Sequence, residues 1–230
     1  MFGLPANYPA IRKIADAHRL FILEDGAQGF GGMIGNKRAC SFGDISTTSF
    51  FPAKPLGCYG DGGAVFTDND EWAALADSYR VHGKGMFKYD NVRIGMNSRL
   101  DTLQAAILKI KFKAFREYEL RDINKAAALY TKLLAGRVKT PGTPEGYYSS
   151  WAQYTICLNS REERDALQAC LKEQGIPSMV YYPTPMHGQT AYKALNAPTD
   201  SCPTATRLSD TVLSLPVHPS NTDEEIETEC

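Results

Sequence analysis

A carboxylate and an amine in the first quarter of the 230-residue chain have the residue types and surroundings that coenzyme chemistry uses. Asp25 follows the apolar run Leu20–Leu23, whose length and composition predict a parallel strand buried on both faces. Open α/β sheets bind ligands beyond the carboxyl ends of such strands, where a buried carboxylate needs a cation or a hydrogen-bond donor. Gln28 would face the same point if the chain turns after Gly26. Taken alone, Asp25 is better interpreted as a helix N-cap or as half of a surface ion pair.

The amine is Lys54, in a loop that follows a second β-rich run, Ile45–Phe51. Pro52 and Pro55 restrict the backbone on either side, because each proline fixes its own φ. Aromatic neighbours and little nearby charge would desolvate the amine and favour its neutral form, which suits Schiff-base chemistry. The glycine-rich stretch 57–63 would let the backbone pass close to a bulky ligand. Without other motifs, an ordinary solvated lysine is the better interpretation.

Together, the two groups fit one coenzyme. A carboxylate that pairs with a pyridine nitrogen and a lysine that bonds to the aldehyde are the protein groups that pyridoxal 5'-phosphate (PLP) chemistry requires. The carboxylate would keep the ring protonated, and the lysine, once displaced, could move a proton. The residues therefore predict a PLP site with Lys54 as the catalytic residue and Asp25 as a cofactor ligand.

The elements that must position these residues follow an α/β order. Helical spacing over 10–18 precedes the first strand, and a third β-rich run, Gly63–Thr67, ends at a predicted helix N-cap within Asp68–Asp70. A long helical pattern begins at Asp101, a predicted N-cap, and extends to Leu134.

After Gly136 and Pro141, the order strand, helix, strand over 151–158, 161–174 and 178–182 predicts a second, smaller α/β unit. We therefore expect two domains, residues 1–135 with the long connecting helix and residues 136–230.

Composition excludes several classes of protein. Lys plus Arg number 25 against 26 for Asp plus Glu, so no strong field indicates nucleic acid or an anionic membrane as a partner. No apolar run is long enough to span a bilayer, and no secretion signal precedes the first helix. The six cysteines are scattered without a C-x-x-C pair or zinc spacing, which favours reduced thiols in a cytoplasmic protein and predicts no metal site.

Five segments in order resemble the successive signatures of the DegT/StrS family of sugar aminotransferases. They are Glu24–Gln28, Thr48–Gly57, Gly60–Ala64, Arg80–Gly83 and Gly95–Asp101, and Tyr182-Pro183 followed by Pro185-Met186-His187 continues the series. The resemblance covers nearly the whole chain, and the segments around Lys54 and Asn97 are its most specific parts. It implies fold type I of the PLP-dependent transferases, with a partial large domain of mostly parallel sheet and a small C-terminal domain.

The resemblance also implies roles for single residues. Asp25 would pair with the pyridine nitrogen, Gln28 would contact the ring, Ser49 would bind the phosphate and Lys54 would form the Schiff base. Asn97 matches an asparagine that reaches the phosphate bound by the other subunit, which implies a homodimer with shared active sites.

Two further residues are expected at the substrate. His187 matches a histidine near the nucleotide-sugar site, and Tyr182 could line a sugar pocket, although aromatic residues in strands are more often part of a core.

The resemblance implies a transaminase that moves an amino group from an amino acid such as glutamate to a nucleotide-linked keto sugar. The sequence around Lys54 looks closest to enzymes that aminate UDP-3-keto sugars for surface polysaccharides. A PLP-dependent dehydratase of the same fold commonly replaces the lysine with histidine, so Lys54 argues against it. A non-catalytic regulator or dimerisation module remains a third possibility. The family's upstream strands and phosphate cradle are not found, so we expect a fragment of a longer coding sequence that binds PLP poorly and turns over little or nothing.

Overall fold

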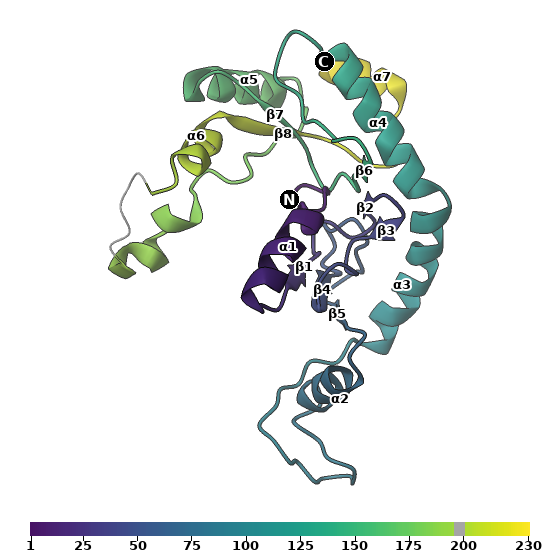
Figure 1. The fold of residues 1–230 in the computed structure, drawn as a ribbon. Coiled ribbons are helices and arrows are strands. Elements are labelled where there is room, and N and C mark those ends of the chain that lie inside the picture. Colours follow the sequence, from purple (N-terminus) through teal and green to yellow (C-terminus); the bar gives the residue numbers. More distant parts are fainter. Residues whose placement is uncertain (196–200) are drawn as a thin grey trace. The chain divides into compact units, whose positions relative to one another are not determined.

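The computed structural model describes residues 1–195 and 201–230 (Figure 1). The chain divides into two compact units, and each is described by itself. Unit 1 comprises residues 1–121 and 143–152, and unit 2 comprises residues 122–142 and 153–230. The division falls inside the long helical stretch after Asp101, and the predicted domain boundary at residue 135 stays a prediction.

Unit 1 contains a three-stranded sheet in the order β1-β4-β5, formed by β1 (Leu23–Asp25), β4 (Ile45–Ser49) and β5 (Gly63–Phe66). β1 pairs with β4 in parallel, and β5 pairs with β4 in antiparallel. The second and third β-rich runs are therefore confirmed as strands. A smaller antiparallel sheet is formed by β2 (Met33–Ile34), β3 (Lys37–Arg38) and β6 (Tyr147–Tyr148).

The prediction for the first apolar run is wrong in two respects. The strand is Leu23–Asp25, so both carboxylates of the Glu24-Asp25 pair lie inside it rather than after it. Ile22 is buried, but Phe21 and Leu23 are 76% and 68% exposed, so the strand is covered on only one face. Successive side chains alternate between the faces of a strand, and an apolar run cannot itself show that both faces are covered.

Two helices of unit 1, α1 (Tyr8–His18) and α2 (Asp70–Tyr79), begin at side-chain caps. In α1 the side-chain Oδ1 of Asn7 accepts a hydrogen bond from the amide of Ala10, and in α2 Oδ1 of Asn69 does the same for Trp72. Such caps satisfy amides that have no partner within the helix. The predicted cap before α2 is thus confirmed at Asn69.

The long helical pattern is confirmed as α3 (Thr102–Ala114), a π-helical turn η1 (Phe115–Glu119) and α4 (Leu120–Leu133), which follow one another without a break (Figure 1). Asp101 occupies the N-cap position but makes no side-chain cap hydrogen bond. The core of unit 1 packs α3 and η1 against the region after β4. Its buried members are Leu56, Cys58, Leu108, Phe115 and Leu120, flanked by Phe30, Phe50 and Tyr148.

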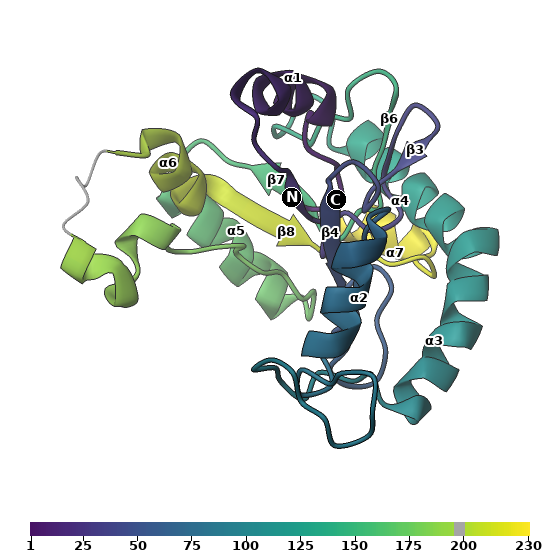
Figure 2. The same ribbon diagram turned by 60° about the horizontal axis from the view of Figure 1, so that its bottom comes forward.

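Unit 2 is built on the antiparallel pair β7 (Tyr154–Cys157) and β8 (Val212–Leu215). The helix α5 (Arg161–Glu173) lies next to α6 (Pro203–Thr211) and β8 in both views (Figures 1 and 2). Unit 2 also contains residues 122–133 of the long helical stretch, η2 (Met186–Gly188), η3 (Thr190–Leu195) and α7 (Asp223–Glu229).

The strand predicted at 178–182 does not form. Only Met179 bridges to β8, through its pairing with Ser214. Pro177 and Pro183 flank this run and lack the N–H groups that a longer ladder would need. The stretch that carries Tyr182 is therefore irregular backbone.

Within residues 1–195 and 201–230, no helix is both long enough and apolar enough to cross a membrane.

Candidate active site

The register of the first sheet brings two predicted ligands to the same face. Asp25 on β1 pairs with Thr47 on β4, and Ser49 lies two residues further along β4. Paired residues of neighbouring strands share a face, and so do residues two apart on one strand. Asp25, Thr47 and Ser49 therefore line one face of the sheet, while Glu24 and its neighbours on β4 line the buried face.

Asp25 lies at the carboxyl end of β1 with an exposed side chain. Its Oδ1 accepts a hydrogen bond of 3.0 Å from the amide of Ala27, which fixes the carboxylate at the turn after the strand. Burial lowers the pKa of the Met1 ammonium, and the negative charge of Asp25 opposes that shift.

Gln28 is half-buried, and its amide is oriented toward the N-terminal segment. The Oε1 atom accepts a hydrogen bond of 2.9 Å from the backbone amide of Phe2. The main-chain carbonyl of Gln28 accepts a hydrogen bond of 3.2 Å from the hydroxyl of Ser150. Its predicted contact with a coenzyme ring stays a prediction.

Ser49 and Lys54 lie on either side of a tight turn. The Ser49 hydroxyl oxygen accepts a hydrogen bond of 3.2 Å from the amide of Phe51. The amide of Lys54 donates one of 2.9 Å to the carbonyl of Phe51. Both side chains are half-buried. Lys54 therefore lies in a hydrogen-bonded turn shortly after Ser49, the last residue of β4.

Asn97 lies in the segment after α2 and forms an isolated antiparallel bridge with Val81. Its Oδ1 accepts a hydrogen bond of 2.9 Å from Nε of Arg99. Asn97 lines an open cavity of about 1210 Å³ whose wall also includes Thr47 and Gly63. Its predicted role at the other subunit's coenzyme stays a prediction.

The two predicted substrate residues belong to unit 2. Tyr182 is 51% exposed, and its ring lies 5.4 Å from that of Tyr181 in an edge-on arrangement. His187 is half-buried in η2. Asp25, Gln28, Ser49, Lys54 and Asn97 all belong to unit 1.

A carboxylate that the sequence analysis did not single out, Glu24, is the most completely bound of the region. It is 1% exposed, and its Oε1 accepts a hydrogen bond of 2.7 Å from the amide of Cys40. Its Oε2 accepts three more, from the amides of Phe42 and Gly43 and the hydroxyl of Ser46. Four donors suit an acceptor-only carboxylate. Glu24 thus fixes the chain before β4 to the strand that carries Asp25.

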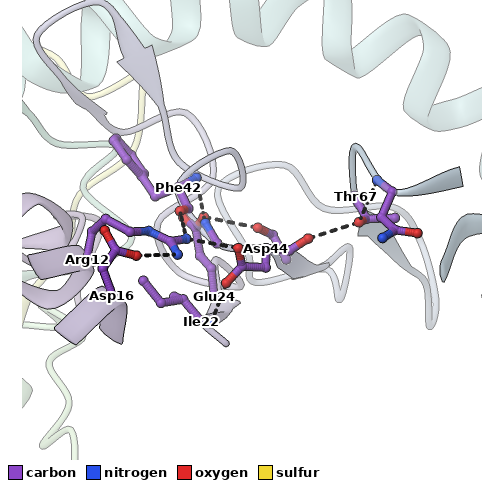
Figure 3. Close-up of polar contacts among 10 residues, drawn as sticks. Arg12, Asp16, Ile22, Glu24, Phe42, Asp44 and Thr67 are labelled. Atoms are coloured by element: carbon purple, nitrogen blue, oxygen red, sulfur yellow. Dashed lines mark hydrogen bonds and ion pairs between the residues drawn. The ribbon is translucent and has the colours of Figure 1, made fainter. Parts of the chain in front are cut away.

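Asp44 extends this network to α1 (Figure 3). Its Oδ2 accepts a hydrogen bond of 2.7 Å from the amide of Ile22, and its Oδ1 lies 3.2 Å from the Arg12 guanidinium. The hydrogen bond from the Ile22 amide is the largest cause that lowers the pKa of Asp44 below its usual value, and the Arg12 guanidinium lowers it further. The signal in the sequence that could have indicated Glu24 is its position directly before Asp25. In a strand, side chains alternate between the two faces, so a carboxylate next to a residue of predicted function lies on the opposite face.

The sequence profile of the DegT/DnrJ/EryC1/StrS aminotransferase family matches residues 1–229. The UDP-2-acetamido-2-deoxy-3-oxo-D-glucuronate aminotransferase of Pseudomonas aeruginosa is 41% identical over 220 residues, which are 95% of this chain and 59% of that protein. A pleiotropic regulatory protein of Geobacillus stearothermophilus is 42% identical over 229 residues, 98% of this chain and 60% of that protein.

Among solved structures, a DegT/DnrJ/EryC1/StrS aminotransferase from Brucella abortus matches with a TM-score of 0.94 and 45% sequence identity. The match covers 100% of this chain and 60% of that one. The fold is thus that of the type I PLP-dependent transferases, as predicted. The chain spans about 60% of the length of the relatives it matches.

Proposed function

Because the chain belongs to the DegT/DnrJ/EryC1/StrS aminotransferase family, we propose that it transfers an amino group from an amino acid, with glutamate favoured, to a nucleotide-linked keto sugar. The family is PLP-dependent. The name of the Pseudomonas relative favours a UDP-3-keto sugar as the acceptor. The observation that carries the proposal is the strand register that presents Asp25 and Ser49 on one face, directly before the turn that holds Lys54.

The residues present fit the coenzyme. An exposed carboxylate suits a pyridinium nitrogen, a hydroxyl at a strand end suits a phosphate oxygen, and an amine in a tight turn suits an aldehyde. Asp25, Ser49 and Lys54 supply these three groups in that order. PLP, when bound, supplies an electron sink at the carbon that carries the amine. Asp25 would hold the ring nitrogen protonated, and Nζ of Lys54 would take and return the proton of the donor's α-carbon.

For substrate and partner, the proposal assigns Tyr182 and His187 to the nucleotide sugar and Gln28 to the coenzyme ring. It also includes a homodimer in which Asn97 reaches the partner's coenzyme. The segment before Asn97 supports this, because apolar side chains there are almost fully exposed, with Met86 at 94% and Ile94 at 96%. Exposed apolar side chains gathered in one segment are typical of an interaction site. The free thiols of all six cysteines are in keeping with a cytoplasmic protein.

A non-catalytic regulator of the same fold is the second candidate, and the name of the Geobacillus relative is the observation that favours it. Such a protein would keep the coenzyme-binding groups without turnover. Lys54 still argues against the dehydratase alternative.

Borohydride trapping tests the proposal on the 230-residue chain. At a PLP concentration high enough to offset the weak binding expected of this chain, we expect borohydride to leave a reduced adduct on the Lys54 peptide at least about tenfold above that on the exposed Lys132, measured by mass spectrometry. Glutamate added before the borohydride should discharge most of it.

Three outcomes decide between the candidates. Equal labelling of Lys54 and Lys132 would overturn the coenzyme site, and with it both candidates. A Lys54 adduct that glutamate does not discharge would favour the regulator. The Lys54→Arg variant controls for adducts elsewhere in the chain.

A further inference from the structure

The loop that carries Lys54, residues 50–62, is closed by its own backbone. The amide of Phe50 donates a hydrogen bond of 2.8 Å to the carbonyl of Gly62, which continues the pairing of β4 with β5. The amide of Cys58 donates one of 2.7 Å to the carbonyl of Phe50. Lys54 lies within the smaller ring closed between residues 50 and 58. The geometry of that ring therefore limits where the lysine amine can lie.

The side chain of Cys58 reinforces the same closure. The residue is 0% exposed, and its Sγ lies 3.0 Å from the carbonyl oxygens of both Phe50 and Gly60. A thiol has one proton, so it donates to one carbonyl at a time or shares the proton between them. Cys58 also packs in the core of unit 1 with Leu56 and Leu108. It joins the loop to the core, to Phe50 at the start of the ring and to Gly60 beyond its end.

A second anchor comes from α3. The Oε1 of Gln104 accepts a hydrogen bond of 2.8 Å from the amide of Tyr59, the residue after Cys58. A Cβ on Gly60 would lie 3.2 Å from the Nε2 of Gln104, so this side chain lies tightly against the loop. Two neighbouring loop residues are thus held by independent contacts.

We propose that Cys58 is a positioning residue for Lys54, and that its thiol, together with Gln104, presents the amine from a preformed turn. The role follows from the contacts on the loop. Its consequence for the coenzyme rests on the function proposed above. Displacing a reacting group by about 1 Å can cost on the order of a hundredfold in rate, so the anchoring of this turn matters as much as the amine itself.

Competitive acylation of the lysines by trace acetic anhydride, across a pH series and without coenzyme, tests the proposal. In Cys58→Ala the thiol donor is lost, and we expect Lys54 labelling relative to Lys132 to rise at least about threefold as the turn loosens. Cys58→Ser keeps a donor to the same carbonyls. Its ratio of Lys54 to Lys132 labelling should stay within about twofold of that in the unmodified chain at every pH. Cys170→Ala, which changes an exposed cysteine, is the matched control.

The same variants are then treated with PLP and borohydride. We expect Cys58→Ala to trap about tenfold less adduct on Lys54, with Cys58→Ser near the original value. Unchanged Lys54 labelling in Cys58→Ala would overturn the proposal. So would an equal change in Cys58→Ser, because the thiol hydrogen bond would then have no role.

If Cys58→Ala does not fold, the Lys54 labelling of Gln104→Leu is compared with that of Gln104→Glu. Leucine removes the acceptor for the Tyr59 amide and should raise the labelling, whereas glutamate keeps the acceptor and should not. The failure of this inference and that of the proposed function are distinguishable. An absent PLP adduct in the unmodified chain, with the labelling difference intact, contradicts only the proposed function. An intact adduct with no labelling difference contradicts only the positioning role.

Discussion

Two adjacent carboxylates, Glu24 and Asp25, lie on opposite faces of the sheet β1-β4-β5 and differ in burial and in hydrogen bonding. Glu24 faces inward, is 1% exposed and accepts four hydrogen bonds. Asp25 faces the other side, is exposed, and its Oδ1 accepts a hydrogen bond from the Ala27 amide. One residue of separation on a strand produces this difference, because successive side chains alternate. The inner carboxylate holds the strand, and the outer one is available for chemistry.

The inner face is a polar network rather than an apolar core. Ser46 and Thr48 of β4 are buried beside Glu24, and the Thr48 hydroxyl donates to the carbonyl of Gly26. On the outer face, Leu23 is 68% exposed and Val65 is 52% exposed. Polar groups that are buried and satisfied fix one geometry, so the inner face sets the direction in which Asp25 points.

The largest effect on stability is expected on the inner face. Glu24→Gln replaces one acceptor oxygen with an NH₂ that meets backbone donors, and Glu24→Ala leaves those donors unsatisfied. We expect each to lower the free energy of unfolding by about 3 kcal/mol or more, since breaking a buried charged network costs several kcal/mol. Urea denaturation measures this.

Glu145→Gln is the matched control, because Glu145 is exposed in a loop of unit 1. It should change the free energy of unfolding by less than about 0.5 kcal/mol. Equal effects of the two Glu→Gln changes would show that the inner face does not hold the strand.

Asp44, at the edge of the network, should have an intermediate effect that depends on pH. Its pKa is lowered in the folded state, mainly by the Ile22 amide. The stabilisation is therefore present above the unfolded pKa of about 3.9 and is lost as the pH falls below it. We expect Asp44→Asn to cost roughly 1 kcal/mol at pH 7, because the side chain is partly exposed.

Denaturation of both proteins at pH 7 and pH 3 measures this effect. The difference between wild type and Asp44→Asn should shrink at the lower pH. A difference that stays constant would contradict the assigned role of the Asp44 charge.

The smallest effect on stability is expected on the outer face. Asp25→Asn should change the free energy of unfolding by less than about 0.5 kcal/mol, as for other exposed side chains. The same change should raise the PLP concentration needed for half-maximal borohydride trapping on Lys54 by about tenfold, because the ring nitrogen loses its anionic partner.

Asp101→Asn, at an exposed position without a cap hydrogen bond, should change neither quantity. A large loss of stability in Asp25→Asn, with PLP trapping unchanged, would contradict the assignment of stability to the inner face and of coenzyme binding to the outer face.

Local patterns were enough for the elements whose determinants lie close in sequence. The helix start at Asn69 depends on a side-chain cap and the long stretch from Thr102 to Leu133 on helical spacing, and both were predicted. The strand expected at 178–182 was not found, because pairing with β8 stops at Met179. Strand length depends on a partner distant in sequence, which a local pattern cannot supply.

For the candidate site, the sequence alone determined which chemical groups are available and in what order: a carboxylate, a hydroxyl and an amine at Asp25, Ser49 and Lys54. Only the tertiary structure decided that Asp25, rather than Glu24, faces outward, and that Cys58 and Gln104 hold the lysine turn. Alternation along a strand is local, but which face becomes buried depends on the segments that pack on it. Here residues 40–46 pack on the face that carries Glu24 and bind its carboxylate, so this face is the buried one.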